Sequence, residues 1–168
     1  VTISGSTTKV PAAQMTALTT VPGGIDAIED GEIIQYTPET PQRFRYITLS
    51  GTTPGNYMFA CAELRVFGKK ANVPEATDVN IAAGKPYTEG LKFYNEENGG
   101  GFEAKNINDG NEATAALAFA PASGTYFYKI DLLNFYDISA LELPSRTEVQ
   151  GWSAYDLGNI TLLGSVAN

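Results

Sequence analysis

The sequence predicts an all-β fold, built as an antiparallel sandwich or barrel. Short runs of alternating apolar residues recur along the chain, and clusters of turn-forming residues separate them. Of the 168 residues, 17 are glycine and 9 are proline, and these interrupt almost every window long enough for three helical turns. A charged fraction of only 18% and an aromatic fraction of 11% indicate a chain that folds around a core and is not disordered.

Five segments carry the strand pattern. The strongest is 57–67, in which alternate residues face one side, namely Met58, Ala60, Ala62, Leu64 and Val66. The other predicted strands are 43–49, 126–132, 138–143 and 160–163. Turn clusters at 50–56, 98–101 and 121–124 separate them. The best helical candidate is short, 111–119, because four alanines supply helix propensity there.

A polar stretch follows the strongest strand and shows no strand alternation. We interpret it as a linker at 71–77 between two blocks, 1–70 and 78–168. The length supports one ordinary domain or two small ones. Neither block looks complete alone.

Charge and composition exclude several classes of protein. Lys and Arg number 11 against 19 Asp and Glu, so the formal charge is −8 and no basic footprint for nucleic acid exists. No apolar run approaches the roughly 20 residues of a membrane span. The chain contains no histidine, which removes the common catalytic triads, and its only cysteine, Cys61, is expected to be a buried, inert thiol. We therefore expect that the protein is not an enzyme.

Several motifs resemble one known family. Residues 43–49 (RFRYITL) and 62–68 (AELRVFG) resemble the closing strands of coagulation-factor type C (discoidin) domains, a family that includes many carbohydrate-binding modules. The opening half of the same family is similar to 79–86 (VNIAAGKP), 106–114 (NINDGNEAT) and 128–132 (YKIDL). The resemblance implies an antiparallel jelly-roll β-sandwich of the galactose-binding type, split or permuted.

The order of the halves is unusual, because the closing half comes first. In addition, residues 1–6 (VTISGS) and 160–165 (ITLLGS) resemble the same strand, which starts at position 1 and again at position 160, an offset of 159 residues. Three interpretations fit: a fragment of a tandem array, a circularly permuted single domain, or a subunit whose halves pair with neighbouring chains.

The loop around Asp109 is the best site candidate. Hard oxygen donors at short spacing suit Ca²⁺, which takes 6–8 oxygens. The resemblance implies a structural calcium held by the Asp109 and Glu63 side chains, Thr114, and the carbonyls of Asn106, Asn111 and Ala62. The alternative is that Asp-Gly-Asn is simply a turn. Asp109 and Glu63 lie in opposite blocks, so they share a site only if the chain is permuted or the halves meet between molecules.

A glycan site is the weaker hypothesis. Aromatic faces and directional polar groups bind sugars, and loop residues could supply both: Tyr94, Asn95, Glu96, Arg146, Trp152 and Tyr155. For these aromatic residues, packing at the rim of a sandwich is the alternative role, and Arg146 is equally explained as a solvated loop residue. The acidic pairs at 29–32 and 96–97 are expected to be solvated surface charge.

The functional prediction is a non-catalytic extracellular or cell-surface repeat. It acts as a building block that assembles head to tail with other copies of the chain or adjacent repeats into a fibre or filament. The alternative is a glycan- or surface-binding adhesion module of a larger exported protein.

Overall fold

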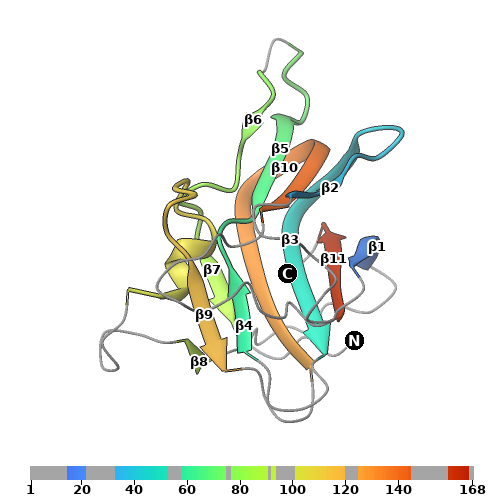
Figure 1. The fold of residues 1–168 in the computed structure, drawn as a ribbon. Helices are drawn as coiled ribbons and strands as arrows, with labels where there is room; N and C mark the ends of the chain where they lie inside the picture. Colours follow the sequence, from blue (N-terminus) through green and yellow to red (C-terminus); the bar gives the residue numbers. More distant parts are fainter. Residues whose placement is uncertain are drawn as a thin grey trace.

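The computed structural model of the chain describes residues 15–21, 33–52, 58–74, 77–90, 92–93, 101–119, 125–144 and 159–166. Most of these residues are in strands, which are joined by turns and one short 3-10 helix (Figure 1). The elements are β1 (Met15–Val21), β2 (Ile33–Tyr36), β3 (Gln42–Thr52), β4 (Met58–Cys61), β5 (Arg65–Lys70), β6 (Val79–Asn80), β7 (Tyr87–Glu89), β8 (Lys92–Phe93), η3 (Ala104–Ile107), β9 (Ala116–Phe119), β10 (Thr125–Pro144) and β11 (Asn159–Ser165).

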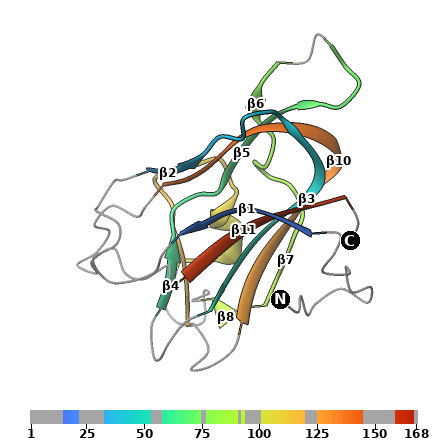
Figure 2. The same ribbon diagram turned by 90° about the vertical axis from the view of Figure 1, so that its right-hand side faces the viewer.

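Two antiparallel sheets make up this fold. The larger sheet has the order β1-β11-β3-β10-β5-β6, with β2 and β7 also paired to β10. The smaller sheet has the order β4-β9-β8, and in Figure 1 its strands lie to the left of β3, β10 and β11, so that they lie behind these strands in the turned view of Figure 2. No helix among the described residues is long and apolar enough to cross a membrane. The predicted all-β class is confirmed.

A single apolar core joins the two sheets. The large sheet contributes fully buried side chains from β3 and β10, such as Ile47 and Ile130, while Ala116 and Ala118 come from β9 of the small sheet. Two opposed sheets that share one core form a sandwich-like architecture.

Strands from the two predicted blocks alternate across the sheets. Within the large sheet, β10 lies between β3 and β5, and β11 lies between β1 and β3. In the small sheet, β9 of the second block pairs with β4 of the first. Strands from the two predicted blocks therefore complete each other's sheets within this one chain. The exact block boundaries stay a prediction.

The longest strand, β10, contains two of the predicted strands. Segments 126–132 and 138–143 are its two arms, and the pairing with β3 shifts register between Asp131 and Tyr136. Residues 132–135 face a single residue of β3 across this shift, so the strand bulges there. The bulge lies between the two arms of β10. The first arm pairs with β3 and β7, and the second arm pairs with β3, β5 and β2.

Two predictions about local structure are wrong. The segment 57–67 is two strands, because β4 pairs in the small sheet and β5 in the large one, with residues 62–64 turning the corner between them. The predicted helix at 111–119 contains a turn and then strand β9. Tertiary pairing overrides the helix propensity of its alanines, because β9 lies between β4 and β8 and alanine side chains fit the core there.

Candidate metal centre

The corner between β4 and β5 holds Glu63 against a loop of the second block. The backbone N–H of Leu64 donates to the carbonyl of Ile107 at 2.6 Å, so residues 62–64 lie beside the end of η3. The chain then turns through Gly110, whose φ of 81° lies in the left-handed region that favours glycine. This contact brings the first block next to the loop that carries Asp109.

The loop that we call the acidic loop, residues 109–114, is closed by its own polar groups. The Asn111 N–H donates to Asp109 Oδ1 at 2.7 Å. The Thr114 hydroxyl lies 2.8 Å from Asp109 Oδ2 and 2.7 Å from the Asn111 carbonyl oxygen. Oxygen atoms from three residues are thus gathered within one short loop.

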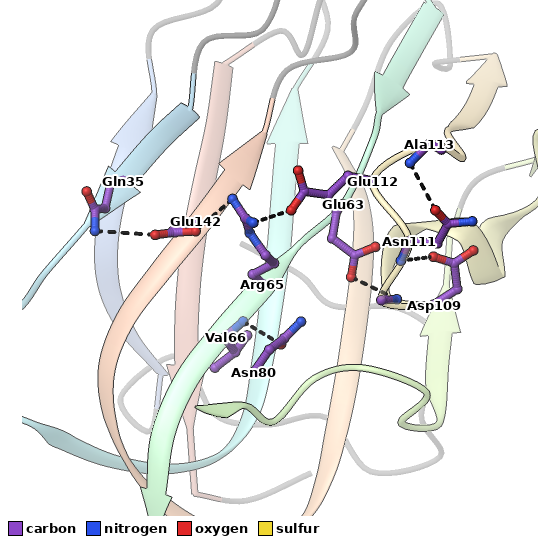
Figure 3. A network of polar contacts seen from close by, with 11 residues as sticks. Gln35, Glu63, Arg65, Val66, Asn80, Asp109, Asn111, Glu112, Ala113 and Glu142 are labelled. Atoms are coloured by element: carbon purple, nitrogen blue, oxygen red, sulfur yellow. Dashed lines mark hydrogen bonds and ion pairs between the residues drawn. The ribbon is translucent and has the colours of Figure 1, made fainter. Parts of the chain in front are cut away.

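Glu63 carries a buried carboxyl group beside the acidic loop. Its residue is 0% exposed, its Oε1 accepts a hydrogen bond from the Gly110 N–H at 3.3 Å, and its Oε2 is buried with no hydrogen-bond partner (Figure 3). Burial raises the pKa of this carboxyl to about 7, and the negative charge of nearby Asp109 adds to the rise. A buried carboxyl oxygen without a donor is costly, and a cation would satisfy it.

These residues fit a calcium ion in their chemistry. The Glu63 and Asp109 carboxyls interact with each other, and the Thr114 hydroxyl and the Asn111 carbonyl lie beside Asp109; carboxylate, carbonyl and hydroxyl oxygens are the hard donors that calcium takes. No group of three or more His, Cys, Asp or Glu side chains that could hold a metal occurs in the part of the chain that the structure describes. Carbonyl, hydroxyl or water oxygens would therefore supply most of the donors.

Four of the predicted calcium residues are brought together: Glu63, Asp109, Asn111 and Thr114. Ala62 and Asn106 are each close in sequence to the Leu64–Ile107 contact. The side-chain amide of Asn106 is directed elsewhere, since it donates to the carbonyls of Gly101 and Ala115 at 2.6 and 2.9 Å. Only its carbonyl is left for the predicted role.

The predicted glycan-binding residues fall outside the described part of the chain. They are Tyr94, Asn95, Arg146, Trp152 and Tyr155. Cys61 is buried as predicted, and burial raises the pKa of its thiol.

Sequence reasoning missed an ion-pair network that anchors the acidic loop. Arg65 of β5 pairs with Glu112 of this loop, and its other terminal nitrogen lies 2.8 Å from Glu142 Oε2 on β10. Gln35 of β2 donates to Glu142 in turn, at 3.4 Å (Figure 3). These residues lie 47 or more positions apart, so no local pattern relates them.

Comparisons with known proteins identify no relative. No family model matches the chain, and neither the curated proteins nor the solved structures give a match.

Proposed function

We propose that this chain is a non-catalytic β-sandwich module of the discoidin-like, jelly-roll type, which works outside the cell and is stabilised by calcium. The two-sheet architecture supports the proposal, as does the pairing of its two blocks within one chain. The single observation that carries it is the buried Glu63 carboxylate, with Oε2 unsatisfied and Asp109 beside it.

The calcium in this proposal fastens the two blocks together. Glu63 belongs to the first block and Asp109 to the second, and their negative charges oppose the contact in the absence of a cation. A cation between them converts this repulsion into attraction. Modules that bind calcium with affinities of about 10⁻⁴–10⁻³ M are typical of extracellular proteins, so calcium supply would match the proposed location.

The role of the module is that of a building block. An end strand of a sheet presents unpaired backbone groups, which are a template for another strand. Among the strands that the structure describes, β1 ends the large sheet on one side and β6 ends it on the other. Adjacent repeats or other copies of the chain would meet at such edges. Because the blocks already complete each other's sheets, this assembly does not need an exchange of whole blocks between chains.

The experiment is a thermal unfolding series with calcium chloride and with chelator. A ligand that binds only the folded state at 100 times its dissociation constant stabilises by about 2.7 kcal/mol, or roughly 5–10 °C in melting temperature. We expect this shift in the wild type and its loss in Asp109→Asn. The matched control is Glu39→Gln, an exposed acid far along the chain from the acidic loop, which should keep the full shift. Equal melting temperatures with calcium and with chelator in the wild type would contradict the proposal.

A further inference from the structure

A hollow of about 320 Å³, which we call the basic hollow, lies where β5, β6 and β10 meet, near the top of Figure 1. Two lysines line it, and no acidic side chain stands among its described lining residues. The residues that matter for binding are Lys70, Asn80, Ile81, Lys85 and Tyr136. In a chain of formal charge −8, this hollow offers two positive charges that no carboxylate of its described lining opposes.

Lys70 stands where the core-facing side of β5 reaches solvent. Along this strand the buried residues are Val66 and Gly68, and Lys70, the next residue on that face, is exposed. Opposite Lys70 in the sheet is Tyr136 of β10, which packs against the edge of the core. Neither Lys70 nor Lys85 forms an ion pair with any residue that the structure describes.

Two acidic residues near β5 have partners of their own. The carboxylate of Asp137 accepts two hydrogen bonds from the Arg43 guanidinium, at 2.8 and 3.0 Å. The carboxylate of Asp78 accepts the hydroxyl of Ser139 at 2.8 Å. Both acids line a second hollow, which Lys70 also borders. Neither acid lines the basic hollow, so their charges do not occupy it.

The other polar residues of the basic hollow are held in place by backbone contacts. The Lys85 N–H donates to the Ala82 carbonyl at 3.0 Å, and the Lys85 carbonyl accepts from Nδ2 of the buried Asn108 at 2.9 Å. Asn80 Oδ1 accepts the N–H groups of Val66 and Ala82, each at 3.2 Å, which leaves its amide NH₂ group as a donor (Figure 3). A lining fixed in advance lowers the entropy cost of binding.

We propose that the basic hollow binds the sulfate or phosphate group of a small polar molecule, with Lys70 and Lys85 as its cationic contacts and Asn80 as a neutral donor. Lysine binds such oxyanions as a point charge, whereas planar carboxylates favour the fork of an arginine. The volume of about 320 Å³ falls within the roughly 300–1,000 Å³ of small-molecule sites. Ile81 and Tyr136 offer apolar surface to the rest of the molecule. This inference does not depend on calcium or on the proposed function.

The test titrates the full chain with glucose 6-phosphate, glucose 6-sulfate and glucose in buffer without calcium, followed by calorimetry. We expect at least one ester to bind with a dissociation constant of about 1 mM or below, and glucose to bind at least about tenfold more weakly. Whichever ester binds identifies the anion as phosphate or sulfate. The absence of saturable binding for both esters, or binding of glucose as tight as that of the esters, would overturn the proposal.

Three lysine variants then locate the site. Lys70→Gln and Lys85→Gln should each weaken the bound ester about tenfold, because each removes one charge-assisted contact. Lys69→Gln is the matched control: it removes the same charge one position away, from a residue that borders the second hollow and not the basic hollow. It should bind as the wild type does. An equal loss in Lys69→Gln would show a general attraction between charges and overturn the proposal.

Glucuronate tests the choice of anion. It carries a planar carboxylate on a sugar of the same size, so we expect it to bind at least about fivefold more weakly than the better ester. Glucuronate binding as tight as that of the esters would overturn the assignment to a sulfate or phosphate group. Melting temperatures equal to the wild type in all three lysine variants confirm that the losses come from the site and not from unfolding.

Discussion

The guanidinium of Arg65 forms an ion pair with the carboxylate of Glu112, which lies 47 residues further along in the acidic loop. The side chain of Arg65 is only 18% exposed, and the same guanidinium also holds Glu142 of β10. A loop of the second block is thereby fastened to a strand of the first and to the centre of the large sheet.

Replacing Arg65 should therefore loosen the acidic loop. We expect Arg65→Ala to lower the free energy of unfolding by about 1–3 kcal/mol, because it leaves the largely buried Glu142 carboxylate without its cation, while the exposed Glu112 contributes less. Arg65→Lys should recover part of the loss, since one ammonium cannot make the forked contact. Urea denaturation measures the change, and hydrogen exchange should show faster exchange at Asn111 and Thr114. Lys69→Ala, on an exposed position of the same strand, is the control; an equal loss there would contradict the prediction.

Glu63→Gln should have opposite effects on stability without calcium and with calcium, because the buried carboxylate destabilises the fold alone and binds the ion in the proposed site. In chelator at neutral pH, we expect this variant to be more stable than the wild type by about 1–3 kcal/mol, because it removes a buried charge next to Asp109. An amide can still accept from Gly110 through its oxygen and can donate toward Asp109. In calcium, the order should reverse, because the wild type gains a ligand that the variant lacks. Urea denaturation in both buffers measures this. Destabilisation in both buffers would contradict it.

Leu133 should tolerate asparagine better than leucine. It lies in the β10 bulge with a φ of 67°, in the left-handed region, and its side chain is 51% exposed. Asparagine adopts this conformation at lower cost, so Leu133→Asn should raise the free energy of unfolding by about 0.5–1 kcal/mol. Leu133→Val should lower it, because a β-branched side chain resists this conformation. Thermal or urea unfolding of the pair checks the sign, and the opposite order would contradict the prediction.

The ion pair of Arg45 with Asp131 should make stability depend on acid pH. The two hydrogen bonds, 2.9 and 3.0 Å, hold the pKa of Asp131 below its ordinary value of 3.8. Folding thus favours the ionised form, and the stabilisation is complete above about pH 5 and is lost as the pH falls through the folded pKa. Asp131→Asn should be less stable than wild type by about 1 kcal/mol at pH 7, and the difference should shrink as the pH falls through the lowered folded pKa.

Asp137→Asn is the matched comparison for the pH dependence of Asp131→Asn. Asp137 pairs with Arg43 in the same geometry, but the two side chains are 34% and 49% exposed against 26% and 36% for Asp131 and Arg45. Solvent screens the more exposed pair, so Asp137→Asn should cost less at pH 7. A pH-independent loss in Asp131→Asn would contradict the assignment to the ion pair.

The sequence predicted the strands better than their connections. Segment 43–49 lies within β3 and 160–163 within β11, because alternation of buried and exposed residues is a local property. The break inside 57–67 was missed, since two strands that belong to different sheets still share one alternating pattern through the corner at Glu63. The helix predicted at 111–119 failed for a similar reason: alanine suits both a helix and a crowded core strand.

The candidate site, like the fold, could be predicted from the sequence only in part. Family resemblance pointed to Asp109 and Glu63, and the structure places their carboxyls close together. The anchoring contact of Arg65 with Glu112 depends on the crossing of β5 and the acidic loop in space, which no spacing in the sequence encodes. The burial that leaves Glu63 Oε2 without a donor is likewise a property of the packed fold.

The interleaving of the two blocks also has a consequence for biosynthesis. In the sheet, Thr52 at the end of β3 pairs with Thr125 at the start of β10. A ribosome adds roughly 5–20 residues per second, so β3 leaves the exit tunnel several seconds before its neighbour in the sheet exists. During that interval the apolar side chains of Ile47 and Leu49 lack the β10 and β11 part of the core that buries them in the folded chain. The pairing of β3 in the large sheet therefore has to wait for the synthesis of β10, and a holding chaperone would have a defined segment to protect in that interval.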